Sequence, residues 1–301
     1  MLGQVITAMA TPFDDKGEIN LNEAKRLAAY LLENGTDAVL AAGTTGESPT
    51  LTHLEKLELV KSLKAEFGDR LTLIAGAGTN DTHGSIELAK EMESLGADAL
   101  LVVSPYYNKP PQEGLLRHFA AVAGAVKLPV IIYNIPGRTG VNLLPSTLAK
   151  LLPIPNLLAV KECSNSLTQA TEFLMEIEKA GRGKTAPKNR RFYLYSGEDP
   201  LTLPLLSLGG KGVISVASHL GGKEFQTMFR AYREGRVEEA ERMHFKLYPL
   251  IQALFMTTSP IMIKAALELK GFKMGHLRAP LLDADPAQIA IMKKVLADFE
   301  R

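Results

Sequence analysis

Short apolar runs of strand length alternate with amphipathic segments along most of the chain. Segments such as NEAKRLAAYLLENG and THGSIELAKEMESLG place apolar residues at helical spacing and end on glycine. The runs that predict buried strands are VITAMA (5–10), DAVLAAG (37–43), LTLIAGAG (71–78), DALLVVS (98–104), PVIIYN (129–134), LLAVKE (157–162), FYLYSG (192–197) and GVISVA (212–217). A doubly wound sheet more often stops at about five or six strands. Repeated strand-then-helix units of this number therefore predict an α/β fold, the (β/α)8 TIM barrel.

After the last predicted strand the pattern becomes helical only, in VEEAERMHFKLYPLIQALFM, PIMIKAALELKG and PAQIAIMKKVLADF. We expect residues 1–235 to form the barrel and residues 236–301 a C-terminal α-helical region that packs on the barrel or on another subunit. The basic segment 179–191 enters the seventh predicted strand, which places it on the face remote from the chemistry, where we expect a solvated loop.

Charge and cysteine content narrow the class of protein. The 34 basic and 33 acidic side chains nearly cancel, which argues against nucleic acid or membrane as a partner and favours a small, modestly charged ligand. One cysteine excludes a disulfide framework, and the histidines show no close paired spacing for a metal. No segment reaches the roughly 18 apolar residues that span a bilayer. We expect a cytoplasmic enzyme that uses no metal.

In such a barrel the active site is built where the strands end, and several ends are unusual. They carry GTTGES (43–48), SPYYNKPP (104–111), YNIPGRTG (133–140), Lys161 in VKEC, and SGEDP (196–200). Lys161 follows a run that is apolar on both faces. Its ammonium group either snorkels into water or is desolvated, which lowers its pKa and frees the neutral amine to attack a carbonyl.

The neighbours of Lys161 favour the second interpretation. Tyr133 lies at the equivalent end of the adjacent strand, and a hydroxyl such as that of Thr44 can support a proton relay through the phenol. Arg138 offers a planar fork that suits a carboxylate. Cys163 has no histidine partner in the sequence pattern and is expected to be inert. The pattern predicts class I aldolase chemistry on a 2-oxo acid.

The four segments GTTGES, SPYYNKPP, YNIPGRTG and VKEC resemble, in order and spacing, those of the pyruvate-dependent class I lyase family, which contains dihydrodipicolinate synthases and N-acetylneuraminate lyases. The resemblance covers essentially the whole chain. Arg138 favours the synthases, in which an arginine here binds the carboxylate of the aldehyde substrate. The alternatives are N-acetylneuraminate lyase, a 2-keto-3-deoxy sugar acid aldolase and, as a different class, a non-enzymatic pyruvate sensor.

The resemblance implies roles for particular residues. Lys161 forms an imine with pyruvate, and the proton relay consists of Tyr133, Thr44 and Tyr107. Thr45 joins Thr44 at the pyruvate carboxylate. The backbones of Gly197 and Ile214 line the site. The implied reaction condenses pyruvate with L-aspartate 4-semialdehyde to 4-hydroxy-tetrahydrodipicolinate, in diaminopimelate and lysine biosynthesis, without a cofactor.

The resemblance also implies assembly and regulation. Tyr107 reaches the site of a neighbouring subunit across a tight dimer interface, and the expected homo-oligomer is a tetramer of two such dimers. The positions matching the family's allosteric lysine site are Ser48, Pro49, His53, Lys56, Asn80, Gly84 and Tyr106. Gly84 stands where sensitive members carry a carboxylate, so we expect little or no inhibition by lysine.

Overall fold

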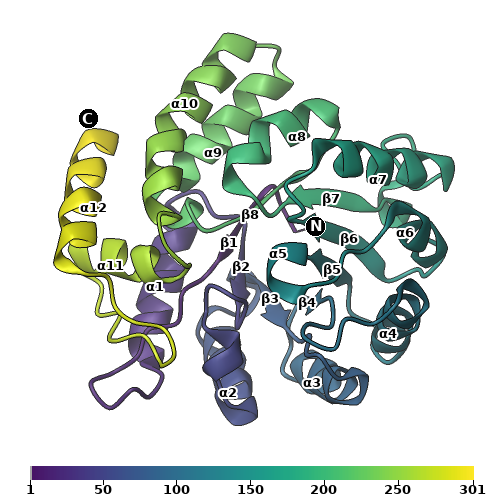
Figure 1. The fold of residues 1–301 in the computed structure, drawn as a ribbon, viewed down its shortest axis with the longest axis horizontal. Helices are drawn as coiled ribbons and strands as arrows, with labels where there is room; N and C mark the ends of the chain where they lie inside the picture. Colours follow the sequence, from purple (N-terminus) through teal and green to yellow (C-terminus); the bar gives the residue numbers. More distant parts are fainter. Residues whose placement is uncertain (1) are drawn as a thin grey trace. The chain divides into compact units, whose positions relative to one another are not determined.

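The computed structural model of the chain describes residues 2–301. Its strands follow one another in sequence order as a closed parallel barrel, which confirms the predicted fold (Figure 1). The strands are β1 (Val5–Ala8), β2 (Ala38–Ala41), β3 (Thr72–Gly76), β4 (Ala99–Val103), β5 (Val130–Asn134), β6 (Leu157–Glu162), β7 (Tyr193–Ser196) and β8 (Gly212–Ser215). Most are shorter than their apolar runs, because residues such as Met9 and Ala10 remain buried after the chain has left the strand.

Helices follow the strands and continue to the end of the chain. They are α1 (Leu21–Glu33), α2 (His53–Phe67), α3 (Thr82–Ser94), α4 (Gln112–Gly124), α5 (Pro136–Thr139), α6 (Pro145–Leu151), α7 (Leu167–Lys179), α8 (Thr202–Leu208), α9 (Ser218–Arg233), α10 (Val237–Leu254), α11 (Ile261–Leu269) and α12 (Pro286–Phe299). Short 3-10 helices cover Ser48–Thr50, Gly68–Arg70, Lys188–Arg190 and Asp199–Leu201. Across residues 2–301, no helix combines the length and the apolar character that a membrane crossing requires.

The sequence marks several helix ends. A capping box between Thr52 and Glu55 opens α2, because each residue's side chain accepts a hydrogen bond from the other's backbone N–H. Asp285 and Gln288 open α12 in the same way. Gly209 ends α8 with a φ of 113°, a left-handed conformation that favours glycine, so LGGKG (208–212) forms a tight turn from this helix into β8.

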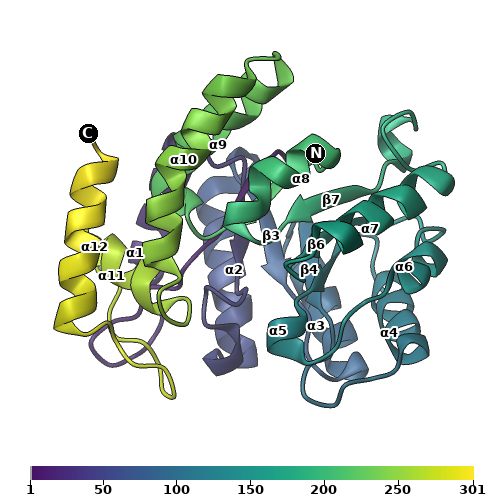
Figure 2. The ribbon, with the colours of Figure 1, turned by 45° about the horizontal axis from the view of Figure 1, so that its top comes forward.

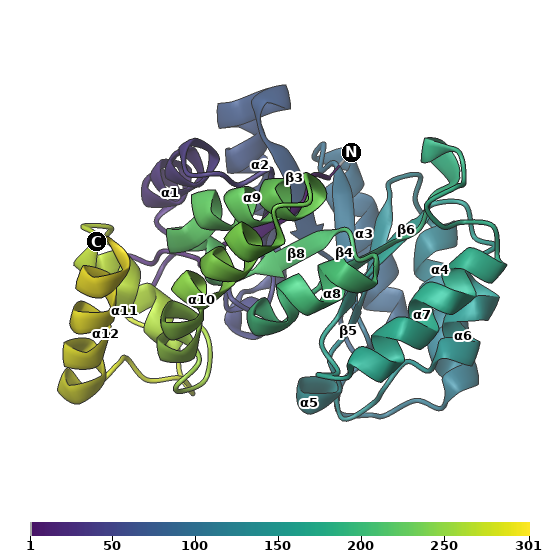
Figure 3. The same cartoon turned by 90° about the horizontal axis from the view of Figure 1, so that it is seen from above.

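The described chain divides into two compact units. The central unit is Ile74–Ile214, and the terminal unit consists of residues 2–73 and 215–301. In the central unit β4, β5, β6 and β7 pair in parallel, with Tyr133 opposite Lys161 and Asn134 opposite Glu162. Helices α4, α6 and α7 lie side by side (Figure 3).

The terminal unit joins the start of the chain to its last helices. Helix α9 packs against β1 and α10, and α11 packs against α12 (Figure 2). The predicted C-terminal helical region is thus present as α10 to α12. A division of the chain into folding domains at residue 235 stays a prediction.

The basic segment 179–191 is more ordered than a solvated loop. Lys184, Lys188 and Arg190 are exposed, but Arg182 is buried and donates hydrogen bonds to four backbone carbonyl groups. Its partners are the carbonyl oxygens of Leu152, Ile154, Leu157 and Arg190, at 2.6 to 3.1 Å. The sequence-based prediction is therefore wrong for Arg182, because its guanidinium donors are satisfied by backbone carbonyl groups of the protein instead of by water.

Candidate active site

Lys161 and Tyr133 meet at the carboxyl ends of two neighbouring strands. Their Cα atoms are register partners in β6 and β5, and side chains at partnered positions point to the same side of a sheet. The Nζ of Lys161 lies 4.3 Å from the centroid of the Tyr133 ring. The two residues are only 6% and 4% exposed. The sequence-based pairing of this lysine with this tyrosine is therefore seen in the central unit.

The surroundings of Lys161 favour its neutral form. Burial is the main cause that lowers its pKa below the usual value, and Arg138 acts in the same direction. Cys163, Asp199 and Glu198 oppose the shift. A lysine in this position does not snorkel into water. Because its pKa is lowered, a larger fraction of its side chain is in the neutral amine form than for an exposed lysine at the same pH. The side chain therefore has the property that a carbonyl-attacking nucleophile requires.

Gly197 allows Lys161 to occupy this position. A Cβ atom at residue 197 would lie 2.0 Å from the Sγ of Cys163 and 2.8 Å from the Cε of Lys161. Ile214 is buried in β8, one residue beyond the partner of Ser196, and so stands level with Gly197. Burial raises the pKa of the Cys163 thiol, which keeps it protonated and unreactive at neutral pH.

Arg138 lies on α5, in a loop that a buried polar network holds. Nδ2 of Asn134 donates to Oε2 of Glu162 and to Oδ1 of Asn142, both at 2.9 Å. Gln169 from α7 donates to Oε1 of Glu162 at 3.3 Å and exchanges hydrogen bonds with Asn142 at 2.7 and 3.1 Å. The network lies behind Tyr133 and Lys161, because Asn134 and Glu162 follow them in β5 and β6 and point to the opposite side.

The paired tyrosines lie in the loop between β4 and α4. Tyr107 is 88% exposed, and its φ of 73° is unusual for a bulky residue. Its backbone N–H donates to the Thr139 carbonyl at 3.3 Å, and Asn108 donates from its side chain to the Asn80 carbonyl at 2.8 Å. Tyr106 is also exposed. The loop thus presents both rings outward instead of folding Tyr107 onto Lys161.

The GTTGES turn belongs to the terminal unit. Thr45 is buried and Thr44 is half-buried, while His53 at the start of α2 is exposed. Glu47 donates its backbone N–H to the Thr44 carbonyl at 3.1 Å, and Ser48 donates to the Gly43 carbonyl at 3.2 Å. The turn is therefore compact. A relay between Thr44 and Tyr133 stays a prediction.

Sequence reasoning missed two carboxyl groups of the central unit. Burial, and secondarily Asp199, raise the pKa of Glu198 to about 7. Such a carboxyl group can hold or release a proton near neutral pH. Glu162 is the second, and burial raises its pKa as well. Their positions in the sequence could have indicated both residues, because Glu198 follows β7 at the catalytic end and Glu162 adjoins Lys161.

Two buried histidines, His118 and His219, serve as hydrogen-bonding residues of the fold. His219 accepts from the backbone N–H of Ala10 at 3.1 Å and bonds the Val216 carbonyl at 2.7 Å. His118 bonds the hydroxyl of Thr82 at 3.0 Å. Within residues 2–301, no group of three or more His, Cys, Asp or Glu side chains converges as metal ligands do.

Comparison with known proteins gives the family. The model of the Dihydrodipicolinate synthetase family matches residues 1–298. The chain is 48% identical over 297 residues to a 4-hydroxy-tetrahydrodipicolinate synthase of Heliobacterium modesticaldum, covering 99% of this chain and 95% of that protein. It is 48% identical to the corresponding synthase of a Cyanothece species, with 98% and 97% covered.

A solved structure agrees. It is described as DHDPS from Cyanidioschyzon merolae with lysine bound, and it matches this chain with a TM-score of 0.93 and 45% identity. The match covers 99% of this chain and 98% of that one. Matches of this extent span the barrel and the C-terminal helices alike. The chain belongs to the Dihydrodipicolinate synthetase family.

Proposed function

We propose that the chain is a 4-hydroxy-tetrahydrodipicolinate synthase that condenses pyruvate with L-aspartate 4-semialdehyde, as in diaminopimelate and lysine biosynthesis. The observation that carries the mechanism is a buried lysine of lowered pKa, Lys161, placed against the ring of Tyr133. This arrangement suits the formation of an imine with a 2-oxo acid.

The chemistry follows from the properties of the site. The neutral amine of Lys161 attacks C2 of pyruvate, and loss of water gives the imine. Tyr133 is placed to move protons during this step, with Thr44 and Tyr107 as the other members of the relay. Loss of a proton from the pyruvate methyl group gives an enamine, which attacks the aldehyde carbon of the second substrate. Attack of that substrate's own amine on the imine carbon then closes the ring and releases Lys161.

Two carboxylates must be held during this reaction. Thr44 and Thr45 are the proposed ligands of the pyruvate carboxylate, through hydroxyl and backbone donors. Arg138 is the proposed ligand of the aldehyde's carboxylate, through its bidentate fork. Gly197 and Ile214 line the site around the lysine. The activity requires no metal in this mechanism, because the imine serves as the electron sink.

Assembly and location are part of the proposal. The outward position of Tyr107 supports a tight dimer in which each subunit completes the other's relay, and two such dimers form a homotetramer. We place the enzyme in the cytoplasm. Neither nucleic acid nor a membrane is a proposed partner.

Inhibition by L-lysine is expected to be weak or absent. The proposed contacts for the ligand's α-carboxylate and α-amine are Ser48, His53, Asn80 and Tyr106. Gly84 contributes no carboxylate, and Asp81 beside it caps α3 by accepting from the Gly84 N–H at 2.6 Å. A steady-state titration measures this directly, and strong inhibition at sub-millimolar lysine would show that another acid recognises the ligand's cationic end.

Borohydride trapping with pyruvate, followed by peptide mapping, tests the mechanism. The adduct is expected on Lys161 and is expected to disappear in Lys161→Arg, whose guanidinium group stays protonated. Synthase turnover should fall by about three orders of magnitude or more in that variant. Lys150→Arg, an exposed lysine of α6, is the matched control. Trapping at another lysine, or turnover of N-acetylneuraminate instead of aspartate semialdehyde, would contradict the proposal.

A further inference from the structure

Glu47 is the point at which the C-terminal helical region meets the GTTGES turn. It is 2% exposed, and its φ of 57° is a left-handed conformation that a glutamate rarely adopts. Nζ of Lys264, on α11, lies 2.9 Å from Oε1 of Glu47. The backbone N–H of Arg278 donates to Oε2 at 3.0 Å. Residues more than 200 positions away in sequence therefore supply both partners of this carboxylate.

The ammonium group of Lys264 interacts with other groups of the protein. It is 1% exposed, and its ammonium group donates to Glu47 and, at 3.3 Å, to the His276 carbonyl. The same nitrogen lies 4.3 Å from the centroid of the Phe13 ring. The ammonium group thus has two hydrogen-bond acceptors and one aromatic ring as its partners.

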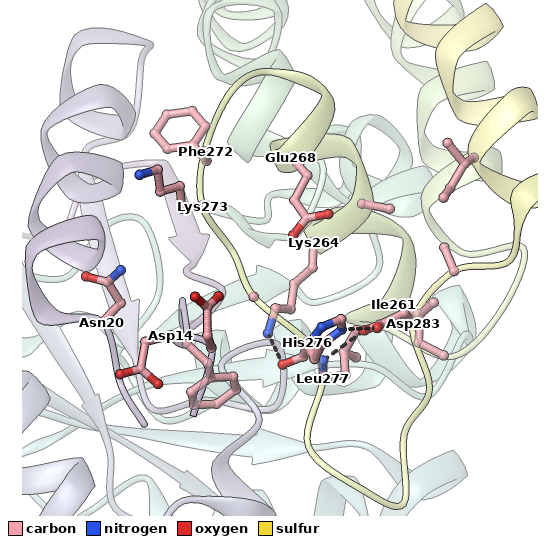
Figure 4. Close-up of a pocket in the computed structure, with 16 residues that line it drawn as sticks. Asp14, Asn20, Ile261, Lys264, Glu268, Phe272, Lys273, His276, Leu277 and Asp283 are labelled. Atoms are coloured by element: carbon pink, nitrogen blue, oxygen red, sulfur yellow. Dashed lines mark hydrogen bonds and ion pairs between the residues drawn. The ribbon is translucent and has the colours of Figure 1, made fainter. Parts of the chain in front are cut away.

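A pocket of about 710 Å³ adjoins this lysine. Figure 4 shows Lys264 on the pocket wall with its bond to His276, and Glu268 and Lys273 around the same space. Because the Lys264 donors are already satisfied, a pocket ligand would have to displace one of them. The geometry assigns this lysine to the turn and not to a ligand.

Backbone hydrogen bonds link Glu47 to the residues that precede it in the turn. The Glu47 N–H donates to the Thr44 carbonyl at 3.1 Å, and Thr11 donates from its hydroxyl to the Gly46 carbonyl at 2.7 Å. A Cβ atom at Gly46 would lie 2.9 Å from the Thr11 hydroxyl oxygen, so the turn is closely packed against Thr11. A strained backbone of this kind persists only where its surroundings hold it.

We infer that Lys264 is a positioning residue: through Glu47 it holds the GTTGES turn in the conformation that presents Thr44 and Thr45 to the carboxylate of the 2-oxo acid. The inference rests on the proposed function, which assigns that carboxylate to the two threonines. It gives the C-terminal helical region a part in substrate binding. The rival interpretation is a pair that only stabilises the fold.

Steady-state kinetics separate the two interpretations. In Lys264→Met the KM for pyruvate is expected to rise by about tenfold to a hundredfold, because a small misplacement of binding groups has effects of this order. The KM for aspartate semialdehyde should change by less than about twofold, since Arg138 lies on another element. Glu47→Gln should give the same pattern, and the double variant should be no worse than either single variant. Lys264→Arg, which keeps the charge, should recover part of the loss.

Lys273→Met is the matched control, because Lys273 is exposed, lines the same pocket and should leave both KM values unchanged. A purely stabilising pair predicts a different result. Lys264→Met would then yield less folded enzyme, but the folded fraction would have the wild-type KM for pyruvate. That result would overturn the inference.

Hydrogen exchange by mass spectrometry tests the turn without any substrate. In Lys264→Met, peptides that contain residues 43–50 should exchange about tenfold faster or more, while peptides of β5 keep the wild-type rate. Unchanged exchange at the turn would overturn the inference even if the wild-type chain proved to have no synthase activity. Faster exchange at the turn with an inactive wild-type chain would refute the proposed function and leave the positioning of the turn intact.

Discussion

A lysine with 6% of its surface exposed has lost most of the hydration that stabilises its charge. For Lys161 the loss outweighs the attraction of Glu198 and Asp199, and its pKa is lowered. The carboxyl groups are close enough to oppose the shift but do not reverse it. The result is a lysine whose neutral, nucleophilic form is reached more easily than that of a lysine in water.

At the residue scale, Gly197 offers a sharp test of this geometry. In Gly197→Ala the new Cβ atom would meet Cys163 and the Lys161 side chain, so Lys161 must move. We expect kcat to fall by about tenfold to a hundredfold in a folded protein, measured by steady-state turnover and circular dichroism. Gly124→Ala is the control, because a Cβ atom placed there meets nothing within 4 Å beyond the adjacent backbone of its own helix.

A second variant distinguishes the cause of that loss. Adding Cys163→Ala to Gly197→Ala removes the closest contact but leaves the one with Lys161. Turnover should stay well below that of wild type. Full recovery would mean that displacement of Lys161 is not responsible.

The sequence predicts that Lys161 and Tyr133 lie side by side, but it does not predict the contacts of the residues that support them. Parallel strands place equivalent carboxyl ends side by side, so the pairing follows from the strand pattern alone. The pairing of Glu47 with Lys264 does not follow from the sequence pattern, because nothing near Glu47 in sequence indicates which lysine will reach it. The packing of α11 determines this pairing. The same holds for the pKa of Glu198, which depends on burial.

At the element scale, the loop that carries Arg138 depends on Asn134. In Asn134→Leu the Glu162 carboxylate loses its 2.9 Å donor, and the backbone N–H of Leu143 loses the acceptor Oδ1. We expect the free energy of unfolding to fall by about 2–5 kcal/mol, because buried polar groups lose their partners. Chemical denaturation followed by circular dichroism measures the change.

The same variant should affect one substrate more than the other. Because the segment that follows α5 loses its bonds to Asn134, the KM for aspartate semialdehyde should rise more than the KM for pyruvate. Asn108→Ala removes a single exposed hydrogen bond, to Asn80, and should change stability by less than about 1 kcal/mol. Equal losses of stability in the two variants would contradict a special role for the network.

The elements themselves were predicted correctly in kind and order, with errors at their ends. Alternation of buried strands and amphipathic helices is a local property, so the chain pattern contains it. Arg182 shows what the pattern lacks. Composition indicates a solvated basic segment, but backbone carbonyl groups between the end of α6 and the start of β6 accept hydrogen bonds from one of its arginines.

At the scale of the whole molecule, two buried histidines make stability depend on pH. Burial lowers the pKa of His118 and of His219 from 6.5 to about 4. Both are neutral in the folded chain, whereas the unfolded chain binds protons near pH 6.5. The contribution of each histidine to the free energy of unfolding is therefore complete above pH 6.5. It is lost as the pH falls towards 4, by up to about 3 kcal/mol for each histidine.

Denaturation midpoints measured between pH 7 and pH 4 check this expectation. The decline should be shallower in His118→Phe and in His219→Gln than in wild type, whatever the absolute stability of each variant. His53→Phe alters an exposed histidine and should leave the slope unchanged. Equal slopes in all four proteins would show that other groups govern the acid transition.

The largest scale is the assembly, and Tyr107 tests it. A tyrosine that is 88% exposed with a left-handed backbone is poorly placed to serve its own subunit and well placed to enter another. Lys161→Ala and Tyr107→Phe should each be nearly inactive alone. In a mixed dimer, one site combines an intact Lys161 with an intact Tyr107 from the other subunit. Random exchange at equal amounts makes about half of the dimers mixed, so about a quarter of the wild-type activity should return. Native mass spectrometry confirms the exchange, and exchange without recovered activity would mean that Tyr107 acts within its own subunit or takes no part in the relay.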